Sequence, residues 1–164
     1  MPESTPTTTR LDLTGAALAC LAAAAVAVAI RVSEPFAHGD WLVAYLALVG
    51  FLAQLLLGRG QVALLPAHDL PPPPRDVRLA QALFWNLGVV AVPVGVLAEI
   101  RLAVVVGSLS LLAALASLWK TARPALVGAI AHRDQQAMSY AAHLMVMTVS
   151  VFIGSSLAWD IPWA

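Results

Sequence analysis

Four histidines are the residues of this sequence with the most versatile chemistry, and they are His38, His68, His132 and His143. An imidazole can bind a metal or a haem iron, and it can transfer protons near neutral pH. The sequence contains no GxSxG, GxxxxGK[ST] or HExxH motif, so a nucleophilic serine, a phosphate loop and a metalloprotease helix are all unsupported. We therefore expect a protein that is not an enzyme.

His143 lies inside an apolar run, where polar groups usually face the interior of a helix bundle or a cavity. At helical spacing it shares one face with Ser139 and Met147. One interpretation is a haem or copper site in which Met145 or Met147 supplies a thioether ligand. The interpretation that we favour is a buried histidine that forms hydrogen bonds across helices, with methionine as packing.

Two further histidines lie beside carboxylates, in His68-Asp69 and in His132-Arg133-Asp134. Together with His143 they could converge on a divalent transition metal, which imidazole and carboxylate suit. Their spacing matches no standard ligand motif, so solvated loop residues are the favoured interpretation and no metal ligands are assigned.

His38 stands directly before the apolar run of FAHGDWLVAYLALVGFLAQLLLG, and it is either a ligand or part of a helix cap. His143 is predicted to lie 15 residues, or about 22 Å, below the outer end of its helix, whereas His38 is within a turn or so of that end. This difference in depth, well over 10 Å by that rise, argues against the two as axial ligands of one haem in the same chain.

The composition identifies a membrane protein, because 60% of the residues are hydrophobic and 11% are charged, against roughly a quarter in soluble domains. Nine basic and nine acidic residues leave a net charge of zero, so nucleic-acid binding is not expected. Cys20 is the single cysteine, which excludes a disulfide framework or a cysteine-based metal site within one chain.

Five apolar segments meet the length of about 20 residues that a spanning helix needs, and they predict an all-α integral membrane bundle. The chain must reverse sharply at Glu99-Ile100-Arg101, because Leu79 to Trp119 is about twice a membrane thickness. Residues 1–10 are predicted to be a disordered cytoplasmic tail, followed by one transmembrane domain over residues 11–159. The predicted helices cover about residues 11–30, 41–57, 79–98, 102–119 and 137–159.

Positive charge predicts the orientation, because Lys and Arg in short loops stay on the cytoplasmic side. With the N-terminus inside, seven of the nine cations fall on that side, which predicts an outer C-terminus and a multi-pass protein of the plasma membrane. The first apolar run, Leu11 to Ile30, is longer than the 7 to 15 residues usual for a signal peptide. An uncleaved first helix is therefore favoured over a cleaved signal.

Two predicted inner loops contain prolines. Pro71 to Pro74 should form a stiff spacer, with a ligand for a proline-recognition domain as the less favoured alternative. The fourth helix is expected to end near Pro124, and Ala125 to Ala131, too short to span, should lie along the inner interface or cap the bundle.

Small residues at four-residue spacing indicate helix-packing faces, which could also form a homodimer. One set is Ala16, Cys20 and Ala24, and the other is Ser150, Gly154 and Ala158.

The run AHGDWLVAYLALVGFLAQLLLGRGQVALLP, Ala37 to Pro66, combines a histidine, an apolar helix with a central glycine and a closing Leu-Leu-Pro. It resembles the second helix of subunit I in the heme-copper (cytochrome c) oxidase superfamily, and particularly small stand-alone membrane proteins that copy the first helices of that subunit. The segments Phe84 to Leu97 and Val105 to Trp119 are similar to the third and fourth helices of those proteins. The resemblance covers about half of the chain.

The resemblance implies that His38 is an axial ligand of a low-spin haem near the outer face. It does not extend to the oxygen-reducing site, because the sequence has no adjacent His-His pair and no full set of copper-ligating histidines. The family supplies its second axial ligand from a later helix that has no counterpart here. That ligand would come from a second protomer, another subunit or a residue not yet identified.

The expected function is therefore that of a membrane protein without a catalytic set, which associates through its helices with itself or with a partner membrane subunit in the lipid bilayer. The alternative is a b-type haem protein, or less favourably a copper protein, for electron transfer or gas sensing. It would use His38, or His143 with Met147. A transporter is least supported, because apart from His143 the predicted spans are almost bare of charged residues.

Overall fold

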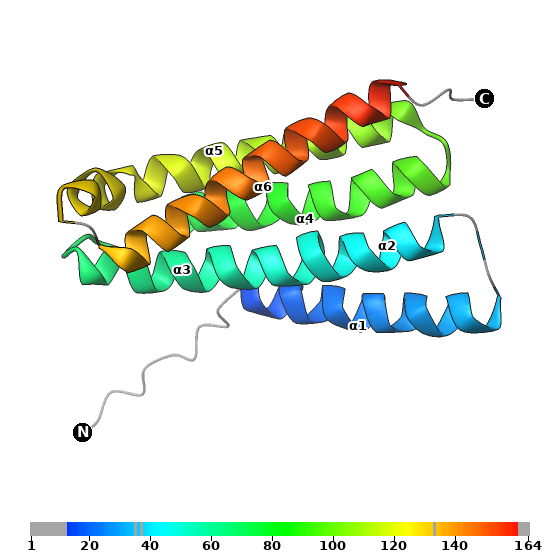
Figure 1. Cartoon of the computed structure of the whole chain (residues 1–164), viewed down its shortest axis with the longest axis horizontal. Coiled ribbons are helices and arrows are strands. Elements are labelled where there is room, and N and C mark those ends of the chain that lie inside the picture. Colours follow the sequence, from blue (N-terminus) through cyan, green and yellow to red (C-terminus); the bar gives the residue numbers. More distant parts are fainter. Residues whose placement is uncertain (1–12, 35, 37, 133, 161–164) are drawn as a thin grey trace.

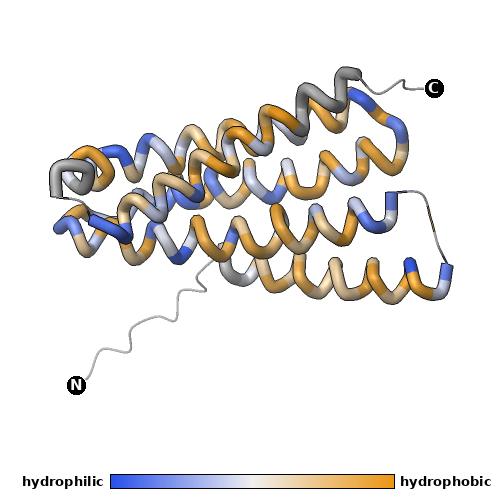
Figure 2. Tube along the Cα trace, viewed as in Figure 1, coloured by the Kyte–Doolittle hydropathy of each residue, from blue (hydrophilic) through white to orange (hydrophobic). Residues whose placement is uncertain are grey.

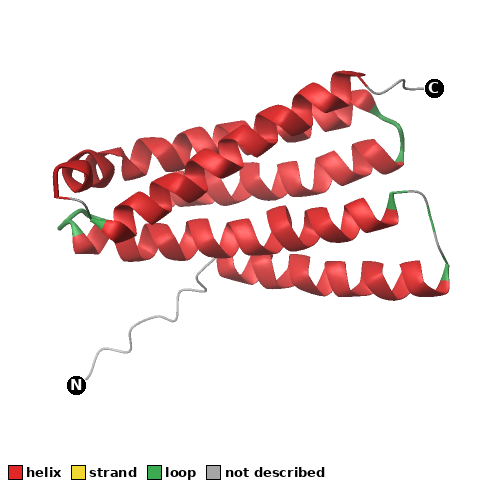
Figure 3. Cartoon of the chain, in the orientation of Figure 1, coloured by secondary structure: helices red, strands yellow, loops and turns green. Residues whose placement is uncertain are grey.

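The computed structural model describes residues 13–34, 36, 38–132 and 134–160, without the side chains of residues 13, 14, 129–132 and 154–160. Every regular element in these ranges is a helix (Figure 3). The elements are α1 (Leu13–Ser33), α2 (Gly39–Tyr45), the π-helix η1 (Leu46–Ala53), α3 (Gln54–Ala67), α4 (Arg75–Leu97), α5 (Arg101–His132) and α6 (Gln135–Asp160). Five helices, with α2, η1 and α3 forming one, are long and apolar enough to cross a membrane. The predicted all-helical architecture, with five helices able to cross a membrane, is confirmed within the described residues.

The five spanning helices run side by side in alternating directions (Figure 1). The helix formed by α2, η1 and α3 packs against α1, while α6 contacts both α5 and α3. The first residues of α1 and the last residues of α6 lie at opposite ends of the bundle. Apolar residues cover most of each helix, and hydrophilic residues gather mainly near the two ends (Figure 2). The predicted placement of the N-terminus in the cytoplasm stays a prediction.

The second spanning helix is longer than predicted, since it continues past Leu57 through Gly58 and Gly60 to Ala67. Glycine inside a helix costs about 1 kcal/mol relative to alanine, which made a loop from Arg59 the simpler prediction. In the structure Gly60 is in contact with the ring of Tyr140 on α6. This close contact between helices gives the glycine a packing role that local sequence preference does not contain.

The connection between α3 and α4 is a short turn followed by the proline run. The Leu70 N–H donates to the Leu65 carbonyl over 2.9 Å and the Asp69 N–H to the Pro66 carbonyl over 3.1 Å, which is a Schellman motif. Asp69 takes the left-handed conformation, with φ of 54°. Pro71 to Pro74 then separate the two helices without forming a helix themselves.

The reversal between α4 and α5 confirms the tight hairpin predicted at Glu99. The two helices are separated by three residues, and the Ile100 N–H donates to the Gly95 carbonyl over 2.8 Å. Glu99 has a φ of 57°, a left-handed conformation that helix ends commonly use. The backbones of α4 and α5 approach closely, since a Cβ on Gly88 would stand 2.7 Å from the Gly107 carbonyl oxygen.

The prediction that the fourth helix ends near Pro124 is wrong, because α5 continues to His132. Proline lacks one backbone donor but does not have to end a helix, and here the last turns after Pro124 bend away from the axis of α5 (Figure 1). Ala125 and Leu126 are buried in the main core cluster. The segment Ala125 to Ala131 is therefore a continuation of α5, and its first two residues pack in the core.

The small-residue face of α1 is used inside the chain. Ala17, Ala24 and Ala27 are buried, and a Cβ added to Gly50 would stand 2.9 Å from the Cβ of Cys20. This contact between α1 and η1 occupies the face that was also a candidate for a homodimer. On α6, Ser150 is exposed, while the side chains of Gly154 and Ala158 lie outside the described residues.

Candidate functional site

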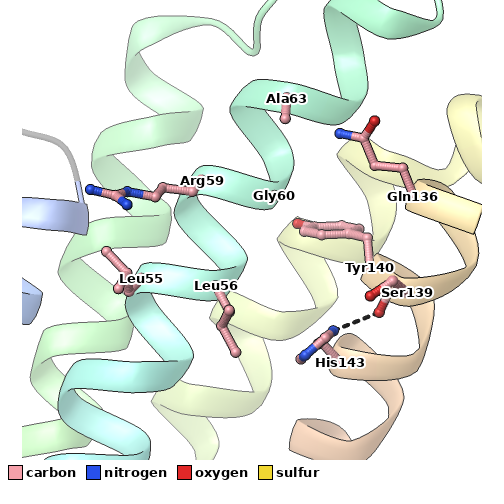
Figure 4. A pocket seen from close by; sticks show the side chains of 9 residues that line it. All are labelled: Leu55, Leu56, Arg59, Gly60, Ala63, Gln136, Ser139, Tyr140 and His143. Atoms are coloured by element: carbon pink, nitrogen blue, oxygen red, sulfur yellow. Dashed lines mark hydrogen bonds between the residues drawn. The ribbon is translucent and has the colours of Figure 1, made fainter.

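A groove of about 420 Å³ lies between α3 and α6, and it contains one of the histidines singled out in the sequence (Figure 4). Its apolar wall on α3 includes Leu55, Leu56 and Ala63. Its polar residues are Arg59 from α3 and Gln136, Ser139, Tyr140 and His143 from α6. The groove therefore combines an apolar wall with several hydrogen-bonding groups.

His143 is exposed, so the prediction that it is buried and bonded across helices is wrong. Its Nδ1 lies 2.6 Å from the Ser139 carbonyl oxygen, one turn earlier on the same helix (Figure 4). Because a carbonyl oxygen only accepts, Nδ1 donates its proton there, and in the neutral ring Nε2 carries the free lone pair. Within the described part of the chain, Nε2 has no hydrogen-bond partner.

Tyr140 anchors α6 against α3 beside this histidine. The residue is 4% exposed, and a Cβ on Gly60 would stand only 2.4 Å from its ring Cδ2. Its hydroxyl is buried without a hydrogen-bond partner among the described residues. The packing of this ring on α3 sets how closely the two helices approach at the floor of the groove.

His38 lies at the start of the second spanning helix, whereas the α3–α6 groove lies along the later part of that helix. It is the exposed N-cap residue of α2, with φ of 62°, and its carbonyl accepts the Leu42 N–H over 2.9 Å. Its side chain makes no capping hydrogen bond. At 1.5 Å per residue, the 17 residues from His38 to Leu55 correspond to about 25 Å. The structure therefore does not bring His38 and His143 together.

Met147 follows His143 by one turn on α6 and is partly buried against the core. Two ligands one turn apart on a single helix lie on the same side of any iron between them, so they cannot fill both axial positions. The described residues thus do not supply two axial ligands for one haem from His38, His143 and Met147. Haem bound through one of these histidines would need a ligand from outside this set.

His68 and Asp134 form a contact between two connections that are distant in the sequence. The His68 Nε2 lies 3.2 Å from the Asp134 Oδ2, and the His68 Nδ1 lies 3.0 Å from the Leu64 carbonyl oxygen. The less favoured alternative, convergence of His68, His132 and His143 on a metal, is not seen among the described residues. No group of three potential metal ligands occurs among the described residues, and the side chain of His132 lies outside them.

A set of buried glutamines was not predicted from the sequence, because the predicted sites were chosen mainly among titratable groups. Gln54, Gln61 and Gln81 are at most 6% exposed. Gln61 donates to the Thr121 hydroxyl over 2.7 Å, and Gln81 donates to the Ser117 hydroxyl over 3.2 Å. Amides within apolar runs were the available signal, since a polar side chain inside a membrane span seeks a partner on another helix.

Gln54, near the middle of the second spanning helix, connects three helices. The Gln54 Nε2 donates to the Gly50 carbonyl over 2.6 Å and lies 3.5 Å from the Asn86 Oδ1 on α4 and 3.7 Å from the Cys20 Sγ on α1. Gln54 is the first residue after η1, where the wider turn of the π-helix changes the direction of the following side chains. The contacts of Gln54 hold the interior of the bundle together and leave the α3–α6 groove as the candidate binding surface.

Comparison with known families, curated proteins and solved structures finds no match to this chain. The resemblance to oxidase subunit I therefore stays a prediction from the sequence.

Proposed function

We propose that this chain is a non-enzymatic, multi-pass subunit of the plasma membrane that acts by helix–helix association. The surface proposed to bind the partner is the exposed face of α6, together with the adjoining α3–α6 groove. The partner is a second copy of the chain or another membrane subunit. The charge pattern of the loops supports an orientation with the N-terminus in the cytoplasm and the C-terminus outside.

The observation that carries this proposal is the outward direction of His143. Polar and ionisable residues in membrane spans almost always face a bundle interior or a water-filled cavity. His143 lies in the third turn of α6, about 12 Å from its first residue, and it is exposed. A lipid chain offers no donor to its Nε2, whereas a neighbouring helix can. The natural bundle would then contain more helices than one chain supplies.

The residues around His143 have the spacing that helix packing requires. From Ser139 onward, and besides Met145 and Phe152 at g positions, seven exposed positions of α6 have the spacing of a, d and e positions in a left-handed helix pair. They are Ser139, Ala142, His143, Val146, Val149, Ser150 and Ile153. This α6 face combines small and polar residues with branched apolar ones, which suits close contact with a second helix.

Disulfide cross-linking in the membrane tests the proposal. In a Cys20→Ala background, Val146→Cys places a thiol on the α6 face, and Leu109→Cys on α5 is the matched control, since the two residues are 62% and 61% exposed. We expect Val146→Cys to form a cross-linked species and Leu109→Cys to form little. The mass of that species distinguishes a homodimer from a pair with another subunit. Equal cross-linking of the two variants would show that α6 is not the association face.

A second variant tests the role of the histidine itself. His143→Leu keeps the apolar bulk of the face and removes the hydrogen bond, which in membrane proteins contributes about 0.6 kcal/mol on average. Cross-linking at Val146→Cys should therefore fall in this variant. Unchanged cross-linking would assign the association to packing alone and remove His143 from the proposal.

Haem binding remains the second candidate, because the hydrogen bond from Nδ1 to the Ser139 carbonyl prepares Nε2 as an iron ligand. The visible spectrum of the purified protein separates the two functions. A Soret band that is lost in His143→Ala and kept in His38→Ala would favour haem at the α3–α6 groove, and the reverse pattern would favour the ligand implied by the oxidase resemblance.

A further inference from the structure

The contact between His68 and Asp134 joins the C-terminal end of α3 to the N-terminal end of α6. His68 is the C-cap residue of α3, and Asp134 immediately precedes α6. The two side chains are partly shielded, with exposures of 20% and 32%. They therefore connect the same two helices that line the α3–α6 groove, at the end where these helices meet (Figure 1).

Both nitrogens of the His68 ring face oxygen atoms. The Leu64 carbonyl, 3.0 Å from Nδ1, can only accept a hydrogen bond, so Nδ1 must carry a proton. The Asp134 Oδ2, 3.2 Å from Nε2, then forms a hydrogen bond only if a second proton lies between these two atoms. The joined pair consequently holds one proton more than a neutral imidazole and a carboxylate hold when apart.

Asp134 has a second bond that fixes its position on α6. Its Oδ1 accepts the Gln136 N–H over 2.9 Å, and its backbone carbonyl accepts the Met138 N–H over 3.0 Å. This is the usual geometry of an N-cap aspartate, so the carboxylate moves with the first turn of α6. The hydrogen bond between Oδ2 and His68 therefore acts directly on the position of α6, the helix that carries Gln136, Ser139 and His143.

The His68 side of the contact is equally well anchored. Leu64, whose carbonyl holds Nδ1, is fully buried in the core, and Ala63 and Gly60 just before it line the groove. Figure 4 shows Ala63 on α3 facing Gln136 on α6 across the groove. Loss of the His68 contact would thus free the two walls of the groove to separate at this end.

We propose that His68 and Asp134 form a pH-sensitive latch that holds α3 and α6 together in the protonated state and thereby controls association through the α6 face. This proposal rests on the function proposed above. Because the joined pair holds the extra proton, the latch is closed at lower pH. It opens as pH rises and the proton between Nε2 and Oδ2 is lost.

The charged neighbours of the imidazole define the matched variants. Among the residues that the structure describes, Asp134 is the carboxylate paired with His68, and Asp69 is the acidic neighbour in its own turn. Asp134→Asn keeps an oxygen that can cap α6 and removes the carboxylate. Asp69→Asn removes an acidic charge at a left-handed position that asparagine tolerates, so it is the control.

The latch is measured by the distance between spin labels at Ala67→Cys and Gln135→Cys, two exposed positions, in a Cys20→Ala background with one chain per nanodisc. We expect a short, narrow distribution at about pH 5.5 and a longer, broader one at about pH 8. Asp69→Asn should behave like the parent, and Asp134→Asn should give the same distribution at both pH values. A parent distribution independent of pH, or a pH response kept in Asp134→Asn, would overturn the latch.

Cross-linking at Val146→Cys measures separately whether the latch is coupled to association. We expect at least about a 5-fold lower yield at the higher pH, the lower end of ordinary coupling between sites, and no pH effect in Asp134→Asn. If the label distance changes with pH but the cross-linking yield does not, the latch does not control association. No cross-linking at either pH would instead contradict the proposed function, and the label distance would still report the latch.

Discussion

The aromatic ring of Tyr140 on α6 packs directly against Gly60 on α3, so close that a Cβ at position 60 would stand 2.4 Å from the ring Cδ2. Tyr140 is 4% exposed and belongs to the main core cluster. This contact explains why position 60 on α3 is a glycine, because a larger residue would meet the ring. It also sets the distance between α3 and α6 at the level of Gly60.

Gly60→Ala should destabilise the protein, because the new methyl group must displace a packed ring. Overpacking of this kind costs about 1 to 3 kcal/mol. Gly128→Ala on α5 is the matched control, since a Cβ there meets nothing within 4 Å. We expect that control to be neutral or stabilised by up to about 1 kcal/mol. Thermal unfolding of both variants in detergent measures the difference, and equal melting temperatures would contradict the packing role of Gly60.

Gln61 and Thr121 should be energetically coupled, because the glutamine amide donates to the threonine hydroxyl over 2.7 Å inside the bundle. A double-mutant cycle of Gln61→Leu and Thr121→Val should give an interaction energy of about 0.6 kcal/mol, with about 1.7 kcal/mol as the upper end. Ser110→Ala replaces Thr121→Val in the control cycle, because the Ser110 hydroxyl bonds to the Val106 carbonyl of its own helix. Coupling as large in the control cycle would show that the measured energy does not come from this bond.

Glu99→Gly should stabilise the hairpin between α4 and α5. A non-glycine residue in the left-handed conformation costs roughly 1 to 2 kcal/mol, and Glu99 has a φ of 57°. The matched variant is Ala98→Gly, because Ala98 has a φ of −96° and gains nothing from glycine. We expect a higher melting temperature for the first variant and an unchanged or lower one for the second. A fall in both would mean that the Glu99 side chain stabilises the turn by more than its backbone costs.

Accessibility labelling tests the predicted orientation. With the N-terminus inside, a thiol at Glu99→Cys should react with a membrane-impermeant reagent from outside intact cells. A thiol at Ala67→Cys, at the opposite end of the bundle, should react only after the membrane is opened. The orientation under test is the one that the positive charges of the loops predict. Labelling of Ala67→Cys alone in intact cells would reverse the orientation.

Several features of the fold were predictable from the sequence because they depend on local composition and on membrane thickness. The lengths of the apolar runs predicted five spanning helices, and the 41 residues between Leu79 and Trp119 required a reversal near Glu99. The exclusion of Cys20 from a disulfide within the chain also followed from a count.

The boundaries and the candidate site were decided by contacts between residues far apart in the chain. Position 60 has room only for glycine because Tyr140 packs on it, and Gln61 finds its partner 60 residues later at Thr121. Whether His143 faces inward or outward depends on where α3 and α5 lie, which helical periodicity does not specify. His68 meets Asp134 only because α3 ends where α6 begins. Chain composition thus determined that this protein crosses a membrane, and tertiary packing decided which polar groups are satisfied inside the bundle and which are left for a partner.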